Sequence, residues 1–227
     1  MREIHDHYFH QAKRDGYLSR AAYKLEEIDD RKKVLSKGDA VLDCGCAPGS
    51  WLQVAARRVG PKGIVIGIDL KPIKQRFQEG NIRTIEGDLC EAKASDLLRE
   101  VQRDRFDVVL SDMAPSTTGD PTRDHFRSAQ LCEALVDRLP HLLKSGGHLV
   151  MKVFEGETYP DLLARLKPIF GKVKGFKPKA SRSESVEMYV IAHDYRAEKD
   201  DDGTAPESTS AAVAPPRPKP RSGWGGS

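Results

Sequence analysis

Short apolar segments alternate with helical ones along most of the chain, and this alternation is the strongest constraint on its fold. Residues 40–44 (AVLDC) and 63–70 (GIVIGIDL) predict strands, and residues 50–60 (SWLQVAARRVG) between them predict a helix. Ser19 is the expected N-cap of an earlier helix, and Pro140 is expected to kink or interrupt a later one. Further strands are expected at 81–88, 106–115, 148–156 and 187–195, and further helices at 19–30, 128–147 and 159–170. The pattern indicates an α/β fold with a mostly parallel central sheet and helices on both faces.

A glycine-containing turn joins the first of these strands to the helix that follows it. In the stretch DCGCAPGSW (43–51), Gly45 and Gly49 permit the positive φ of a tight turn and the close approach of a ligand to the backbone. Asp69 ends the next strand, where a carboxylate can accept hydrogen bonds from both hydroxyls of an adenosine ribose. NAD(P) and S-adenosylmethionine (SAM) both carry such a ribose. The dinucleotide fingerprint G-x-G-x-x-G is absent, because Ala47 and Ser50 stand where it requires glycine.

Acidic residues recur at the ends of successive predicted strands. They are Asp43, Asp69, Asp88 and Asp112. SAM has no phosphate and carries an ammonium and a sulfonium, so carboxylates suit it better than they suit a pyrophosphate. Asp88 is expected near the adenine, where it can accept a hydrogen bond from the exocyclic amine. The simpler alternative is that these acids only cap strand ends, but four of them at successive ends of one sheet favour SAM as the cofactor.

The residues after the cofactor motifs narrow the chemistry. The stretch SDMAP, which contains Asp112, lacks the aromatic residue that amino-methylating enzymes carry at this place, and it offers no cysteine nucleophile for methylating a pyrimidine carbon. Lys152 lies inside the apolar strand VMKVF, and an ammonium there costs free energy unless it is paired. Two interpretations remain open from the residues alone. Lys152 forms a structural salt bridge with Asp112, or it is the general base for an alcohol substrate.

Several motifs resemble a known family. The stretches SRAAYKLEEI, LDCGCAPGSW, SDMAPSTTG, MKVFEG and SRSESVEMYVIA run in order over about residues 8–193 and are similar to those of the FtsJ/RlmE family of RNA 2′-O-ribose methyltransferases. The resemblance implies a Rossmann-like SAM-dependent methyltransferase fold. Cys44, Cys46 and Ser50 depart from the family pattern, since relatives often have Leu, Ala and Gly there.

The resemblance also implies site residues. A Lys-Asp-Lys-Glu catalytic tetrad falls on Lys24, Asp112, Lys152 and Glu187, and SAM contacts fall on Gly49, Trp51, Asp69, Asp88 and Asp112. In this scheme Glu187 neutralises Lys24, while Asp112 orients Lys152 so that its lone pair faces the hydroxyl that is methylated. No metal ion is expected.

The bacterial members of the family imply the substrate, which is a uridine ribose of large-subunit (23S) ribosomal RNA on the assembled 50S subunit. A tRNA 2′-O-ribose methyltransferase of the same family is the close alternative. A small-molecule SAM methyltransferase and a non-catalytic RNA-binding protein are less favoured, because the first would not need a long basic run and the second usually loses part of the tetrad.

Charge and composition divide the 227-residue chain into three parts. We expect a basic and aromatic N-terminal segment at 1–18, the methyltransferase domain at 19–195, and a disordered Pro-rich tail at 196–227. Residues 165–182 hold seven Lys/Arg and no acid, which is typical of a solvated face or of a surface that contacts RNA phosphates. Lacking a signal sequence and a membrane-length apolar stretch, the chain is expected to be a cytoplasmic monomer with no membrane partner.

Overall fold

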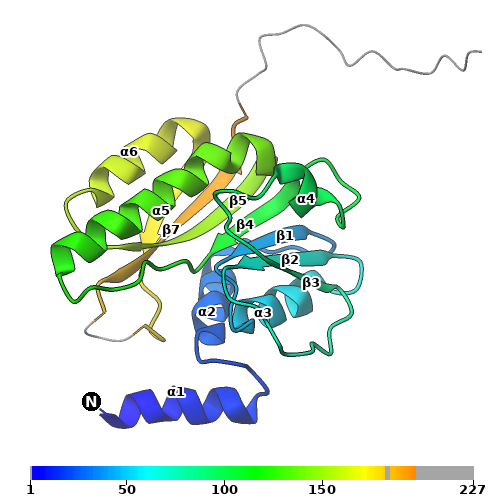
Figure 1. Ribbon diagram of the computed structural model, residues 1–227, viewed down its shortest axis with the longest axis horizontal. Helices are drawn as coiled ribbons and strands as arrows, with labels where there is room; N and C mark the ends of the chain where they lie inside the picture. The colour runs from blue at the N-terminus through cyan, green and yellow to red at the C-terminus, as the bar shows by residue number, and fades with distance from the viewer. Residues whose placement is uncertain (1, 182–184, 198–227) are drawn as a thin grey trace, which may run out of the picture.

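The computed structural model describes residues 2–181 and 185–197. These residues form one seven-stranded sheet in the order β3-β2-β1-β4-β5-β7-β6. The pairs from β3 across to β5 are parallel, and β7 runs antiparallel to both of its neighbours. In Figure 1 the sheet lies between two helical layers, with α5 and α6 on one face and α2 and α3 on the other. The predicted mostly parallel α/β architecture is confirmed.

The bounds of the elements agree closely with the sequence prediction for the first and last strands. The strands are β1 (Ala40–Cys44), β2 (Ile64–Asp69), β3 (Ile82–Glu86), β4 (Phe106–Ser111), β5 (Leu143–Phe154), β6 (Phe170–Phe176) and β7 (Glu187–Tyr195). The helices are α1 (Arg2–Arg14), α2 (Ala22–Lys32), α3 (Ser50–Val59), α4 (Ala94–Leu98), α5 (Pro121–Leu142) and α6 (Tyr159–Ile169).

The core consists of two apolar layers, one on each face of the sheet. Successive side chains of a strand point to opposite faces, so in β5 Val150 joins the layer under α2 and α3, while Met151 joins the layer under α5 and α6. The central strands β1 and β4 are buried along their whole length, as expected for parallel strands that are covered on both sides. Polar functional groups must therefore lie at the strand ends or belong to paired charges.

Three predictions about helix ends are wrong. Ser19 is not the N-cap of α2, because Ala21 occupies that position; the Ser19 hydroxyl instead lies 2.8 Å from the Ser50 hydroxyl oxygen. Helix α5 begins at Pro121 rather than at residue 128, since the side chain of Asp120 accepts hydrogen bonds from the first free N–H groups and proline suits the first helical position. The helix is not interrupted at Pro140, and it ends at Leu142 rather than at residue 147, so β5 begins at Leu143 and not at residue 148.

Three elements were not predicted from the sequence, namely α1, α4 and β6. Strand β6 takes up the centre of the basic run at 165–182, where mostly exposed residues hide the alternation that identifies a strand. The predicted N-terminal segment 1–18 contains α1, and the predicted tail at 196–227 lies outside the described residues from 198 onward. In the part of the chain that the structure describes, no helix combines the length and apolar character needed to cross a membrane.

Candidate active site

A cavity opens at the carboxyl ends of the parallel strands, where sheets of this kind bind their ligands. Its volume is about 580 Å³, which falls in the usual range for sites that enclose an organic ligand. The ends of β2, β3 and β4 bring Asp69, Asp88 and Asp112 into its wall. The structure thus places three of the five predicted cofactor residues around one space.

The turn between β1 and α3 forms part of the wall. Gly45 has a φ of 73°, and a β-carbon at this position would come within 2.7 Å of the Met113 side chain. Asp69 holds the turn in place, because its Oδ2 accepts a hydrogen bond of 2.8 Å from the Ala47 N–H and its Oδ1 accepts one of 2.8 Å from the Lys71 N–H. Asp69 therefore both lines the cavity and fixes the shape of the turn.

The other two predicted cofactor residues, Gly49 and Trp51, lie behind this wall and do not line the cavity. Gly49 has a φ of 114°, and a β-carbon there would meet the ring of Phe77 at 2.6 Å. Trp51 is buried, donates its indole N–H to the Ala21 carbonyl at 2.9 Å, and lies with its ring 5.7 Å from that of Tyr189. Their contact with the cofactor stays a prediction. In the structure Gly49 belongs to the turn, and Trp51 is hydrogen-bonded to the residue that precedes α2.

Asp43 is the most strongly buried charge-bearing group near the cavity. Its side chain is fully buried in β1, and neither carboxylate oxygen has a hydrogen-bond partner among the described residues. Burial raises the pKa of Asp43 well above its usual range, and the nearby carboxylates of Asp112 and Asp69 raise it further. A buried carboxylate without a partner costs free energy, so a cation held in the adjacent cavity would stabilise its charged form.

Lys152 and Asp112 form an ion pair at the edge of the cavity. The Lys152 ammonium lies 3.0 Å from the Asp112 carboxylate and also donates a hydrogen bond of 2.6 Å to the Asp112 main-chain carbonyl. Lys152 is 8% exposed, so its ammonium is nearly removed from water. Because Asp112 is in the cavity wall, this pair joins the predicted cofactor site to the predicted catalytic residues.

Lys24 and Glu187 form a second pair beside the first. The ammonium of Lys24, near the start of α2, lies 2.5 Å from the carboxylate of Glu187, the first residue of β7. Burial raises the pKa of Glu187, but the Lys24 ammonium, the Ser181 hydroxyl and the charge of Lys152 together outweigh burial, so the pKa lies below its usual value. All four predicted tetrad residues are therefore engaged in two ion pairs.

Tyr189 connects the two pairs and was not identified from the sequence. Its hydroxyl donates a hydrogen bond of 2.8 Å to the same Asp112 oxygen that faces Lys152, and the Lys24 ammonium lies 5.9 Å from its ring centre. In the sheet Tyr189 is directly opposite Lys152. Its position two residues after Glu187 was the available signal, since alternate residues of a strand share one face.

The described cysteines offer no activated nucleophile. Burial raises the pKa of the Cys44 and Cys46 thiols, and it raises that of Cys132 to about 12. The Cys132 thiol donates to the Lys152 carbonyl at 3.2 Å, which supports the strand that carries the lysine. Among the described residues, no cluster of His, Cys, Asp and Glu has the arrangement of a metal site.

The residues present fit SAM. The cavity has carboxylates for hydroxyl and amine donors and a glycine turn whose backbone a ligand can approach, and the buried Asp43 carboxyl group lies behind its wall without a hydrogen-bond partner among the described residues. Among the described residues, Lys71 is the one basic side chain in its lining, so no ring of lysine or arginine surrounds it there. That composition favours a cationic ligand over a pyrophosphate.

Comparison with known proteins agrees with this geometry. The sequence profile of the FtsJ-like methyltransferase family matches residues 17–195. The chain belongs to this family. It is 49% identical over 188 residues to ribosomal RNA large subunit methyltransferase E of Syntrophobacter fumaroxidans, an alignment that covers 83% of this chain and 94% of the relative. A protein of the same name from Halobacterium salinarum is 44% identical over 84% of this chain and 73% of its own length.

Solved structures show the same fold in other proteins. A Plasmodium falciparum protein provisionally named a ribosomal RNA methyltransferase superposes with a TM-score of 0.71 at 30% identity, covering 80% of this chain and all of that structure. Fibrillarin from Aeropyrum pernix, which was crystallised with natively bound SAM, superposes with a TM-score of 0.52 at 18% identity over 76% of this chain and 73% of its own. The second likeness concerns the fold alone.

The burial of Asp43 predicts a pH-dependent stability difference. Its folded-state pKa is raised above the unfolded value of about 3.9, so the native protein keeps this proton to higher pH than the unfolded chain. Stability without ligand should therefore fall as pH rises above about 4, by up to about 1.4 kcal/mol per pH unit while Asp43 remains protonated in the fold. Asp43→Asn should lack this component.

The measurement is urea unfolding of both proteins, without ligand, between pH 4 and pH 8. We expect the variant to gain stability relative to the natural chain as pH rises. A stability difference that is independent of pH would contradict the assignment of an uncompensated buried carboxylate.

Proposed function

We propose that this FtsJ-like methyltransferase transfers a methyl group from SAM to the 2′-hydroxyl of a ribose in large-subunit ribosomal RNA. The observation that carries the proposal is the double role of Asp112, which lines the cofactor cavity and holds the Lys152 ammonium at 3.0 Å. Lys152, the proposed base, therefore lies next to the cofactor cavity. The methyl group of SAM and the ribose hydroxyl must meet next to this base for the transfer to occur.

The cofactor contacts follow from the cavity wall. Asp69 binds the ribose hydroxyls of SAM, Asp88 accepts a hydrogen bond from the adenine amine, and Asp112 faces the amino-acid end. Each Asp69 oxygen accepts one backbone hydrogen bond and has further acceptor capacity for a hydroxyl. Gly49 and Trp51 contribute through the position of the turn that they support.

The chain's own groups then divide the work of catalysis. SAM supplies an electrophilic methyl group on its sulfonium. Lys152, when it has lost its proton, takes the proton of the ribose hydroxyl as general base. Asp112 and Tyr189 fix the direction of the lysine, while Glu187 neutralises Lys24, whose ammonium faces the same side of the sheet. Most of the rate enhancement comes from holding hydroxyl and methyl in line.

The substrate assignment rests on the relatives and on the surface. Relatives at 41–49% identity are named ribosomal RNA large subunit methyltransferase E, which supports large-subunit ribosomal RNA over a tRNA. The finer proposal, a uridine of 23S rRNA on the assembled 50S subunit, rests on the family resemblance of the sequence motifs. A basic run at 165–182 supports a polyanionic substrate over a small molecule. One copy of the chain holds all four tetrad residues, which supports the proposal of a monomer, and a cytoplasmic location is part of the same proposal.

A binding measurement tests the cofactor assignment. Asp69→Ala removes a charged acceptor, and hydrogen bonds to charged groups contribute about 1.5–3 kcal/mol, so SAM affinity should fall about 10- to 150-fold. Glu86→Ala is the matched control, because Glu86 is an exposed carboxylate opposite Asp69 in the sheet and does not line the cavity. Titration calorimetry should show near-normal affinity in the control. Equal affinities in the two variants would remove Asp69 from the cofactor site.

The substrate is tested with SAM that carries a labelled methyl group. Unmodified large ribosomal subunits, naked 23S rRNA and tRNA are offered in parallel, and the products are digested to nucleosides. We expect the label in a 2′-O-methyluridine from the subunit. Label in tRNA alone would select the alternative family member, and label on a base would contradict 2′-O transfer.

A further inference from the structure

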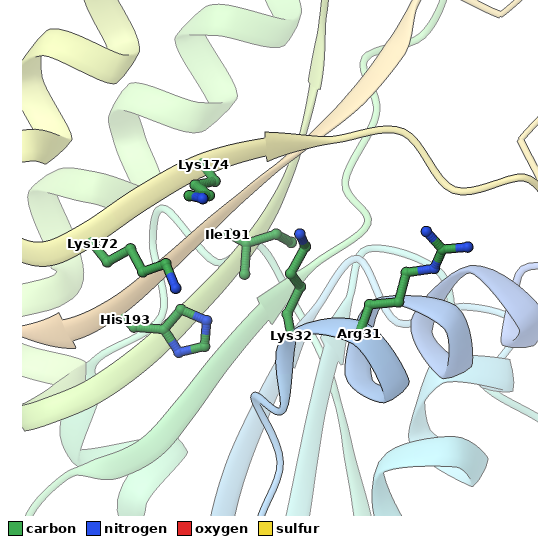
Figure 2. Close-up of a pocket in the computed structure, with 6 residues that line it drawn as sticks. All are labelled: Arg31, Lys32, Lys172, Lys174, Ile191 and His193. Carbon is green, nitrogen blue, oxygen red and sulfur yellow. The ribbon is translucent and has the colours of Figure 1, made fainter.

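A second hollow lies away from the cavity, between the last turn of α2 and the antiparallel edge of the sheet. It is small, about 120 Å³, and Figure 2 shows the six residues that line it. They are Arg31, Lys32, Lys172, Lys174, Ile191 and His193. In Figure 2, Lys172 and His193 lie on one side of Ile191, and Lys32 and Arg31 lie on the other.

Strand pairing explains why these side chains gather. In β6 and β7, Lys172 is opposite His193 and Lys174 is opposite Ile191, so all four point to one face of the sheet. On the same face His148 of β5 lies with its ring 4.7 Å from that of His193. Helix α2 covers the inner part of this face and ends at Lys32, which leaves the β6 lysines exposed beside it.

The part of the chain that the structure describes supplies no acidic partner to the lysines of this hollow. Among the described residues, no ion pair neutralises Lys32, Lys172 or Lys174, whereas Arg31 pairs with Glu27 at 3.3 Å. Basic residues in the last turn of a helix are stabilised by the helix dipole, which accounts for Arg31 and Lys32. It does not account for two further lysines on the neighbouring strand, whose charges repel those of α2.

The lowered pKa of His193 agrees with an excess of positive charge around the hollow. Burial lowers the pKa of His193, and the nearby His148, Lys172 and Lys32 lower it further, against the opposing effect of Asp194. A neutral His193 offers a ring N–H donor beside the lysines without adding to their repulsion. The hollow therefore combines donors and positive charge, as an anion site requires.

We propose that Lys32, Lys172, Lys174 and His193 bind a backbone phosphate of the RNA substrate, an inference that rests on the proposed function. The size of the hollow selects the ligand class, because about 120 Å³ suits a phosphate group and is well below the ~300 Å³ of sites that enclose a whole organic molecule. Flanking it, the Lys32 ammonium lies 4.9 Å from the Phe176 ring centre, which keeps that side chain directed over the strand.

The position of the site defines its role. In β7, Ile191 and His193 are two and four residues from Tyr189, which is opposite Lys152, so the hollow lies roughly 7–13 Å from the base along the strands and is displaced sideways toward β6. A phosphate at that distance belongs to a nucleotide other than the one that is methylated. The site thus docks a neighbouring part of the RNA and leaves the target ribose free to enter the active site.

The test is the salt dependence of RNA binding by Lys172→Gln/Lys174→Gln, measured with fluorescent 23S rRNA fragments and with large subunits. Each lost phosphate contact should make the slope of log K against log salt less negative by about 1. Affinity near 100 mM salt should fall several-fold, while SAM affinity, which reports an intact fold, should stay unchanged.

Lys62→Gln/Lys93→Gln is the matched control, because both lysines are exposed, lie outside the hollow and carry the same total charge. We expect its slope and affinity to equal those of the natural chain. If the natural chain methylates ribosomal RNA and the two double variants bind it alike, the docking site is wrong and the proposed function stands. If the natural chain neither binds nor methylates ribosomal RNA, both proposals fall.

Discussion

An ammonium group inside a covered sheet needs a counter-charge, and Asp112 supplies it to Lys152. This ion pair lies where the proposed cofactor cavity meets the proposed catalytic residues. Lys152 lies in β5 and Asp112 follows β4, so pairing them ties the neighbouring strand ends together. Removing one partner of a buried pair typically costs about 3–5 kcal/mol, because the other charge is left without compensation. The same carboxylate forms part of the cofactor cavity, so its position decides both where SAM lies and where the base points.

The second pair and Tyr189 extend this arrangement across the sheet. Lys24 lies in α2, in the helical layer, and Glu187 lies in β7, in the sheet. Their charged groups are 2.5 Å apart, so this ion pair joins the two layers. Tyr189 donates to Asp112 and packs beside Trp51, so the apolar layer under α2 and α3 supports the neighbouring charged groups. The sequence motifs that carry the tetrad are separate along the chain, but in the fold their side chains form one connected set of contacts.

The residues alone predicted the central strands, the strand-end carboxylates and the demand that Lys152 be paired, because each depends on local pattern or on burial cost. The roles of Lys24 and Glu187 came from the family resemblance, since no local pattern brings the start of a helix to the start of a distant strand. Tyr189 was missed because a tyrosine in an apolar strand looks like ordinary core. Strand β6 was missed because its lysines, exposed on the edge of the sheet, obscure the alternation that marks a strand. Gly49 and Trp51 lie behind the cavity wall and do not line the cavity. The spacing of residues in the sequence could not show this, because it depends on how the turn folds back.

The most direct test of the account is the single-turnover rate of methyl transfer by Lys152→Arg on saturating large subunits, followed over pH. An arginine keeps the charge next to Asp112 but stays protonated at any working pH, so it can preserve the ion pair and cannot accept a proton. The account predicts a loss of about 10²–10⁴-fold in rate, the usual range for a missing general base. SAM affinity should be near normal, and Lys62→Arg should be as active as the natural chain. A near-normal rate for Lys152→Arg would contradict the account and show that the lysine acts through its charge alone.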